Sequence, residues 1–322
     1  MSENLSPAQN GNAVNNTGFS PNSSAEGGRL ANKDGRINLR KTGVPLYERI
    51  SLYHALLHMG HLTFTLTVFA IYTCLNLSFA MLYYFIGIEN LRGTSLTGSF
   101  LDDFLQAFFF SSQTLTTVGY GHISPVGFVT NVIASLESFI GIMSFALVTG
   151  MFYARFSRPS AYIRFSPNFL VAPFKGGKAL MFRLATYKNN HLTDADAQVT
   201  MAVHVQENGK TVTKFYPLTL EISHINSLAL SWTIVHPLDE KSPLADYTKQ
   251  DFIDCKIEML ITIKAFDDHF SNTVQQRTSY TQDEMVYGAR FLPMYARSED
   301  GNYTNLMLEK INHYEKVDLG EH

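Results

Sequence analysis

The segment Thr117-Val118-Gly119-Tyr120-Gly121 has the clearest chemistry in this sequence. Its glycines accept left-handed backbone angles, so successive carbonyl oxygens can turn toward one axis while Val118 and Tyr120 pack against a preceding helix. Rings of such oxygens replace the hydration shell of K⁺, and the Thr117 hydroxyl adds an oxygen at the inner end. We therefore predict a K⁺-binding filter with ion sites at Thr117, Val118, Gly119 and Tyr120. One chain supplies one loop, so a ring requires a homotetramer.

The loop lies between two apolar segments that are long enough to cross a membrane. Leu62–Ile86 contains no charged residue, and Phe128–Tyr153 contains only Glu137. About 20 apolar residues in a helix span the hydrocarbon core. The shorter Phe100–Gln113 is expected to be a helix that enters the membrane without crossing it. Irregular backbone at membrane depth is tolerated where protein buries it or water lines it, and a pore provides both conditions.

The residues before the first span predict a helix that lies in the membrane interface. Apolar residues recur at helical spacing over Val44–His58. The alternative is that this segment simply begins a long first span. Basic residues precede the first span and follow the second, which predicts a multi-pass protein of the inner membrane with both termini in the cytoplasm. These residues are Arg36, Arg40, Lys41 and Arg49, followed by Arg155, Arg158 and Arg164.

The chain beyond Pro159 has the alternating pattern of an antiparallel β-sandwich of about immunoglobulin size. Residues 1–42 are rich in Asn, Ser and Gly and predict a disordered tail. We therefore expect this tail, an α-helical membrane pore domain over 43–158, and a cytoplasmic all-β immunoglobulin-like domain over 159–322. The expected strands are 179–187, 198–206, 213–222, 229–235, 256–266 and 273–280.

Composition argues against several other classes of protein. The 322 residues carry a net charge of −3, without the basic face that nucleic-acid binding requires. The two cysteines have no CxxC spacing for zinc or redox chemistry. No nucleophile–base or paired-carboxylate arrangement has a recognisable spacing, so we expect no enzyme activity. No cofactor is expected other than K⁺ as the permeant ion.

Three further segments, together with the two spans and the filter, resemble the inward rectifier potassium channel family and its bacterial branch in particular. The resemblance implies a tetramer whose transmembrane pore continues into a vestibule of immunoglobulin-like domains. The extracellular cysteine pair of eukaryotic members is missing, which favours a prokaryotic origin. The segments are Ala-Arg-Phe-Ser-Arg-Pro at 154–159, Glu-Ser-Phe-Ile-Gly at 137–141 and His-Pro-Leu-Asp-Glu-Lys-Ser-Pro-Leu at 236–244.

The resemblance also assigns a gate and a lipid site. Tyr153 corresponds to the aromatic gate at the inner end of the second span, where four rings would close the pore by dewetting; the alternative is a tyrosine that anchors the helix at the interface. Anionic lipids would bind the juxtamembrane cations Arg155, Arg158, Arg49 and Lys41. The alternative for these residues is that they only set the topology.

Glu137 and Phe145 are the candidate pore-lining or pore-adjacent residues of the second span. A carboxylate at membrane depth is expected beside the pore or behind the filter, although a hydrogen-bonded carboxyl between helices is the alternative. Phe145 stands where some relatives carry the acidic residue for polyamine block. Gln113 replaces a pore-helix glutamate, and Lys264 replaces an acidic vestibule residue. These departures argue against strong voltage-dependent rectification, although the family label groups the chain with voltage-gated channels.

Three positions remain open between roles. Gly141 and Gly150 are candidate bending points of the second span, or sites where helices pack closely. His122 directly follows the filter, where protonation would repel cations. Two other functions also remain open. One is a two-span K⁺ channel gated by a soluble ligand, and the other is a membrane-tethered β-sandwich that acts as a binding module.

Overall fold

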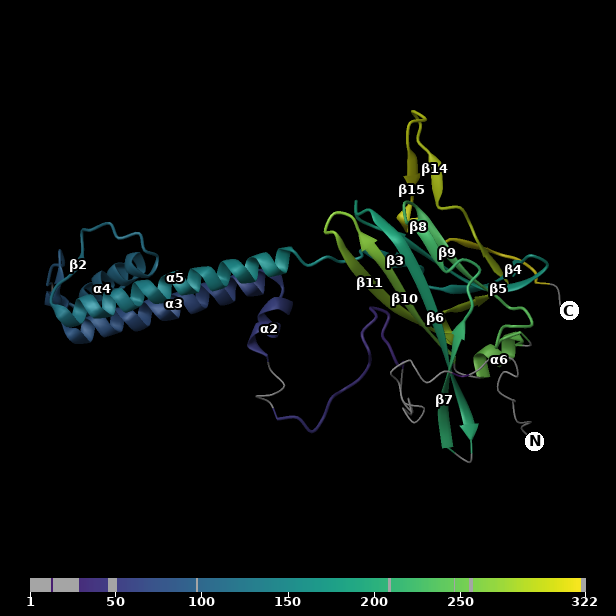
Figure 1. The fold of residues 1–322 in the computed structure, drawn as a ribbon, viewed down its shortest axis with the longest axis horizontal. Helices are drawn as coiled ribbons and strands as arrows, with labels where there is room; N and C mark the ends of the chain where they lie inside the picture. Colours follow the sequence, from purple (N-terminus) through teal and green to yellow (C-terminus); the bar gives the residue numbers. More distant parts are fainter. Residues whose placement is uncertain are drawn as a thin grey trace. The chain divides into compact units, whose positions relative to one another are not determined.

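The computed structural model describes residues 13, 29–45, 51–96, 98–207, 210–245, 247–254 and 257–319. The chain divides into two units, which are described separately below (Figure 1). The helical unit is Thr42–Arg158. The β unit is Pro159–His322 together with Met1–Lys41.

The helical unit contains the two long helices and the shorter helix that the sequence predicts. α3 and α5 run side by side, and α4 packs against both of them (Figure 1). The helices are α2 (Leu52–His58), α3 (His61–Ile86), η1 (Ile88–Asn90), α4 (Phe100–Leu115) and α5 (Phe128–Phe156). A two-stranded ladder of β1 (Leu91–Arg92) and β2 (Ser124–Pro125) joins the loops at the α4 end of the unit.

α2 and α3 are separate helices. α2 ends at His58, and α3 begins at His61 after Gly60. The alternative that this segment begins one long span is therefore wrong. The first part of the predicted interfacial helix, residues 46–50, lies outside the described residues.

The long helices expose their apolar side chains. Their most apolar stretches have mean hydropathies of 1.7 for α3 and 1.9 for α5, yet only 11% and 17% of these stretches are buried. Leu66, Phe69, Phe139 and Ile142 are among the exposed residues. A helix in the core of a soluble protein would bury such side chains, so the surface of this unit is suited to hydrocarbon.

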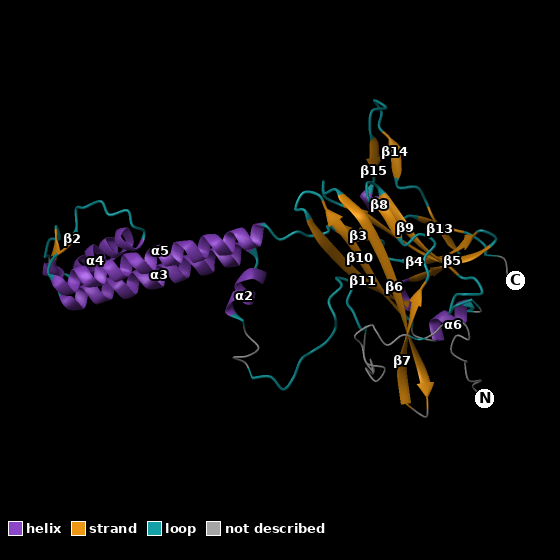
Figure 2. Ribbon diagram, in the orientation of Figure 1, coloured by secondary structure: helices purple, strands orange, loops and turns teal. Residues whose placement is uncertain are grey.

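The β unit is a sandwich of two five-stranded sheets (Figure 2). In the first sheet the order is β11–β10–β6–β7, with β8 also on β6; in the second it is β12–β4–β5–β3, with β9 also on β5. The first sheet contains β6 (Leu192–Glu207), β7 (Lys210–Leu218), β8 (His224–Ser227), β10 (Glu258–Asp267) and β11 (Asn272–Thr281). The second contains β3 (Ile163–Phe165), β4 (Phe169–Phe174), β5 (Gly177–Thr186), β9 (Ser231–Pro237) and β12 (Met285–Tyr287).

Two two-stranded ladders and short helical segments complete the β unit. β13 (Ala289–Phe291) pairs with β16 (Tyr314–Lys316), and β14 (Tyr295–Arg297) pairs with β15 (Thr304–Leu306). The helical segments are α6 (Lys249–Asp254), η2 (Gln282–Glu284) and η3 (Leu308–Lys310).

All six predicted strands are present, as β5, β6, β7, β9, β10 and β11. The shorter strands other than β4 were not predicted, because two to four residues are too few to show alternation. β4 was missed for another reason: its first four residues are buried on both faces, so it has no polar alternation. β12 pairs with β4 in parallel, so the expectation of a purely antiparallel sandwich is wrong at this edge.

The space between the sheets is filled by alternate residues from both. Phe169, Leu184, Met201 and Ile234 are fully or almost fully buried there. Trp232 is 6% exposed in the same core and is the only tryptophan of the chain. Burial of this apolar surface stabilises the β unit independently of any membrane.

Residues 29–39, here called the N-terminal strap, lie on the first sheet. The strap bends so that Ala31 bridges Ile37, with Gly35 in the left-handed region at φ 81°. A Cβ on Gly35 would lie 2.4 Å from the Arg277 carbonyl oxygen, so only glycine fits this approach. The backbone N–H groups of Leu30 and Ala31 donate to the Glu258 carboxylate at 2.7 and 3.0 Å.

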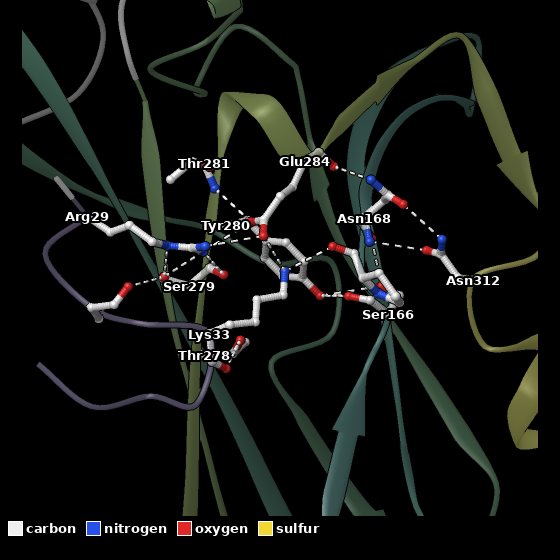
Figure 3. A network of polar contacts seen from close by, with 12 residues as sticks. Arg29, Lys33, Ser166, Asn168, Thr278, Ser279, Tyr280, Thr281, Glu284 and Asn312 are labelled. Atoms are coloured by element: carbon white, nitrogen blue, oxygen red, sulfur yellow. Dashed lines mark hydrogen bonds and ion pairs between the residues drawn. The ribbon is translucent and has the colours of Figure 1, made fainter. Parts of the chain in front are cut away.

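Charged side chains fasten the strap to the end of β11 (Figure 3). The Arg29 guanidinium donates to the Ser279 carbonyl at 2.7 Å and forms an ion pair with Glu284 at 3.0 Å. The Lys33 ammonium lies 3.6 Å from the centre of the Tyr280 ring and 3.2 Å from Glu284. Burial lowers the pKa of Lys33 and raises that of Glu258, whereas the donated N–H groups favour the Glu258 carboxylate.

The prediction that residues 1–42 are disordered is therefore wrong for the strap. Its polar composition does not predict order, but its backbone groups find buried partners on β10 and β11. Residues 1–12 and 14–28 lie outside the described residues.

Candidate selectivity filter and its supports

The filter segment follows α4 directly and alternates in backbone handedness. Thr117, Gly119 and Gly121 have φ of 59°, 55° and 80°, whereas Val118 and Tyr120 do not have positive φ. Alternation of this kind turns successive peptide carbonyls to the same side of the chain. The left-handed Thr117 was not predicted, because a β-branched residue adopts this region only under constraint.

Gln113 supplies part of this constraint. Its backbone carbonyl accepts N–H donation from Val118 at 3.0 Å and Gly119 at 3.2 Å. Its side-chain oxygen accepts the N–H of Tyr120 at 3.2 Å. With these three N–H groups satisfied, the filter carbonyls remain available for a cation. Gln113, which stands where relatives carry a glutamate, thus braces the filter segment through its backbone carbonyl and its side-chain oxygen.

The filter side chains do not pack on their own subunit. Val118 is 53% exposed and Tyr120 is 81% exposed. The expectation that both pack against the preceding helix is therefore wrong within one chain. Such exposure of a large aromatic residue at membrane depth leaves a surface for another protein chain to cover.

The chain beyond the filter is held by a close backbone contact. A Cβ on Gly93 would lie 1.9 Å from the His122 carbonyl oxygen, and Gly93 has φ 94°. The N–H of Val126 donates to the Asn90 carbonyl at 2.8 Å. The loop after α3 thus fixes the exit of the filter, while the His122 side chain is exposed.

Glu137 lies behind the pore helix α4 and is 0% exposed. Its carboxyl oxygens accept hydrogen bonds from the Tyr83 hydroxyl at 2.7 Å and the Ser111 hydroxyl at 2.5 Å. Its own subunit encloses Glu137 completely, so the side chain does not face a pore lumen. The expected place behind the filter remains a prediction. The alternative of a hydrogen-bonded carboxyl between helices is confirmed.

The two glycines of α5 have different surroundings. A Cβ on Gly141 would lie 1.9 Å from the Leu115 carbonyl oxygen, so α4 and α5 are in backbone contact there. A Cβ on Gly150 would meet nothing within 4 Å. The close-packing alternative is confirmed for Gly141, and only Gly150 remains a candidate bending point.

Comparisons with known proteins match both units. The family described as "Ion channel" matches residues 62–158, and the "Inward rectifier potassium channel C-terminal domain" matches residues 163–321. The inward rectifier potassium channel Kirbac3.1 of Paramagnetospirillum magnetotacticum is 33% identical over 279 residues, which cover 85% of this chain and 91% of that protein. The chain belongs to the inward rectifier potassium channel family.

More distant inward rectifiers also match. The channel irk-1 of Caenorhabditis elegans is 25% identical over 85% of this chain and 55% of its own length. The ATP-sensitive inward rectifier potassium channel 15 of Mus musculus is 28% identical over 63% and 57%, respectively. The resemblance to this family and its bacterial branch is thereby confirmed. Nothing in these relatives supports the voltage-gated label, which is withdrawn.

In this inward rectifier chain the candidate gate lies on an exposed face of α5. Tyr153 is 75% exposed, and Phe145 is 76% exposed. Neither side chain is enclosed by its own subunit, in contrast to Glu137. Lys264, the departure in the β unit, is exposed on β10. The assignments of Tyr153 and Phe145 remain predictions.

Arg155 has a structural role that the sequence did not suggest. Its guanidinium donates to the Leu56 and Met59 carbonyls at 2.5 and 2.6 Å, at the end of α2. It also lies 4.5 Å from the centre of the Phe64 ring. Cations are favoured where a helix ends in unpaired carbonyls, so Arg155 ties α2 to α5.

Two of the other candidate lipid-binding residues are exposed, and the third lies outside the described residues. Arg158 is exposed and lies 3.0 Å from the His58 ring nitrogen Nε2. Lys41 is exposed, and Arg49 lies outside the described residues. Arg155 differs from these residues in its contact with the carbonyls at the end of α2, and only the packed structure shows that contact.

Proposed function

We propose that this chain is one subunit of a homotetrameric potassium channel of the inward-rectifier type, in which K⁺ permeates passively. The observation that carries the proposal is the filter backbone of alternating handedness, braced by Gln113 between two helices with apolar surfaces. Four such loops around one axis would present rings of oxygens to a dehydrated K⁺ ion. The exposed Val118 and Tyr120 side chains support assembly, because neighbouring subunits would cover them.

The proposed orientation places both termini and the β unit in the cytoplasm, and the two long helices in the inner membrane. The basic residues that flank the two spans support this orientation. The gate is assigned to Tyr153 at the inner end of α5, where four exposed rings would narrow the pore. Separation of the α5 helices near Tyr153 would then admit water and ions.

The test is rubidium uptake into K⁺-loaded liposomes that contain the purified protein. Uptake that Ba²⁺ blocks and that excess external Na⁺ does not suppress is the expected result. Chemical cross-linking in the same liposomes should reach a tetramer and stop there. A monomer without uptake would overturn the proposal in favour of the tethered β-sandwich module. Uptake that requires a soluble ligand would favour the ligand-gated alternative.

Anionic lipids are the proposed modulators of this channel. Arg158, Lys41 and Arg49 are the candidate contacts, since juxtamembrane cations gain about 1 kcal/mol each near an anionic surface. Uptake should depend on the fraction of anionic lipid in the liposomes, and Arg158→Gln should weaken that dependence. Arg92→Gln is the matched control, because Arg92 is an exposed arginine in the loop between the two spans. Equal effects of the two substitutions would contradict a lipid site at Arg158.

A further inference from the structure

One stripe of α5 is buried, although the rest of the helix is largely exposed. The stripe consists of Thr130, Ala134, Glu137 and Gly141, which share one helix face. A carboxyl group in such a stripe is costly at membrane depth unless its oxygens are hydrogen-bonded. Glu137 meets this requirement through hydroxyl groups from two other helices, Tyr83 of α3 and Ser111 of α4.

Ser111 lies at the centre of this contact. It is 0% exposed, and its hydroxyl oxygen lies 2.5 Å from Glu137 Oε1. The backbone and side-chain oxygens of Asn76 are farther away, at 3.2 and 3.3 Å. A hydroxyl has a single proton to donate. The donated hydrogen bond is therefore assigned to the shortest contact, which is with Glu137. No ion pair with Glu137 occurs among the residues that the structure describes.

The contact lies within two residues of the filter brace. Gln113, which accepts the N–H groups of the filter, follows Ser111 in the last turn of α4. The same turn meets α5 again, where the Leu115 carbonyl touches Gly141. On its other side, the Tyr72 hydroxyl of α3 lies 2.8 Å from Ser112 Oγ. The end of α4 is therefore fixed on both long helices just before the filter begins.

We propose that Glu137 is a positioning residue for the selectivity filter. It holds the last turn of α4 through Ser111, and this turn places Gln113 so that the filter N–H groups are satisfied and the carbonyls face the ion. The inference rests on the proposed K⁺ channel function. Glu137 does not touch the ion, so its substitution acts on the filter through Ser111 and Gln113.

Substitution of Ser111 or Glu137 should therefore change the ion selectivity, although neither residue lines the pore. Discrimination between K⁺ and Na⁺ depends on the number and placement of carbonyl oxygens around the ion. Loosening the end of α4 would let these oxygens follow the smaller Na⁺ ion. Rubidium uptake would persist, whereas the ratio of rubidium to sodium uptake would fall.

The experiment measures this ratio in liposomes for Ser111→Ala, Glu137→Leu and the double variant. Each single substitution removes one side of the hydrogen bond and should lower the ratio about tenfold, because one lost hydrogen bond to a charged or strongly polar group has that effect. The double variant should be no worse than Glu137→Leu, since that substitution already removes the contact with Ser111. Glu137→Gln keeps an acceptor oxygen for Ser111 and should restore most of the ratio.

Ser135→Ala is the matched control, because Ser135 also lies on α5 but, among the described residues, bonds only the Asn131 carbonyl of its own helix. Its ratio should equal that of the unchanged protein. An unchanged ratio in Ser111→Ala and Glu137→Leu tetramers would overturn the proposal, as would additive losses in the double variant. Should Glu137→Leu fail to assemble, Ser111→Ala and Glu137→Gln decide the question. Lack of selective uptake by the unchanged protein would instead refute the proposed function itself.

Discussion

The two units of this chain distribute polar and apolar groups in opposite ways. The β unit buries Phe169, Met201 and Ile234 between its sheets. The helical unit exposes apolar residues along α3 and α5 and buries the polar groups of Asn76, Ser111 and Glu137. The difference follows from the solvent. Water drives apolar groups inward, whereas hydrocarbon accepts them and requires that polar groups be paired inside.

The units also differ in whether a single chain buries all the groups that its structure needs to bury. The β unit has its own core, and its strap is fastened by buried hydrogen bonds within the same chain. The filter has satisfied N–H groups but exposed Val118 and Tyr120 side chains. Folding of the β unit is thus a property of one chain, whereas the proposed ion site needs several.

The largest expected effect is in the filter. Gly119→Ala places a Cβ at φ 55°, a region that disfavours L-residues by about 1 to 2 kcal/mol. Repeated in four subunits, the strain should turn carbonyls away from the axis and lower Ba²⁺-sensitive rubidium uptake by an order of magnitude or more. Gly98→Ala is the control, since Gly98 also has positive φ and open space around it. Equal uptake by both variants would contradict a filter at this position.

A smaller effect is expected at the gate. Tyr153→Ala removes the exposed ring that would narrow the pore, so basal rubidium uptake should rise severalfold without loss of selectivity. Phe139→Ala removes another exposed aromatic side chain of the same helix, nearer the filter end, and should leave basal uptake unchanged. Identical basal uptake by the two variants would contradict a gate at Tyr153.

The next effect lies in the strap of the β unit. Glu258→Gln replaces two acceptor oxygens by one acceptor and one amide donor, so it can satisfy only one of the Leu30 and Ala31 N–H groups. The unpaired N–H should destabilise the docked strap by about 1 to 3 kcal/mol. Hydrogen exchange at Leu30 and Ala31 should accelerate accordingly, which mass spectrometry can measure.

Glu221→Gln is the control for the strap. Glu221 forms an exposed ion pair with Lys175, and such pairs contribute about 0 to 1 kcal/mol. Exchange in the strap should not change in this variant. Slow exchange that persists in Glu258→Gln would mean that the ion pairs of Arg29 and Lys33 hold the strap without the carboxylate.

The smallest expected effect is the pH dependence of the β unit. Burial lowers the pKa of His236, whose Nδ1 lies 2.6 Å from the Thr219 carbonyl and whose Nε2 lies 2.8 Å from Ser242 Oγ. As the pH falls below about 6.5, His236 therefore binds a proton more readily in the unfolded chain than in the folded chain. The stability that neutral His236 contributes is present above this pH and is lost toward lower pH.

Thermal unfolding followed by Trp232 fluorescence reports on this unit alone. Between pH 8 and pH 5.5 the unchanged protein should lose about 1 kcal/mol more than His236→Gln, which cannot titrate. The comparison between the two proteins is necessary because burial raises the pKa of Glu258, and that shift acts in the opposite direction. If the stability of both proteins changed equally with pH, the His236 contacts would have no role in acid stability.

Local pattern predicted much of the fold. Continuous apolar runs gave both long helices within a few residues of their observed ends, and alternation gave the six longer strands. The strap was missed because its order depends on Glu258, 228 residues from Leu30. Neither the composition of the strap nor the spacing of its residues indicates that Glu258 is its partner.

The candidate site shows the same division. The glycines of the candidate filter predicted its left-handed backbone positions, yet the left-handed Thr117 and the three bonds to Gln113 were not predicted. Glu137 was identified as unusual because it is the only charged residue of its span. Its partners Ser111 and Tyr83 are 26 and 54 residues away and follow no periodic pattern.

The sequence by itself determined the two long apolar helices, the glycine pattern of the candidate filter, the family and the sandwich, because each rests on residue types at short, regular spacing. Only the tertiary structure decided that Glu137 is enclosed by its own subunit and bonds Ser111 of α4, that Gly141 is a packing contact, and that Arg155 holds the end of α2. These roles depend on which groups remain unpaired once the helices are packed. Hydrogen bonds act over about 3 Å, so they are set by the final positions of atoms from distant parts of the chain.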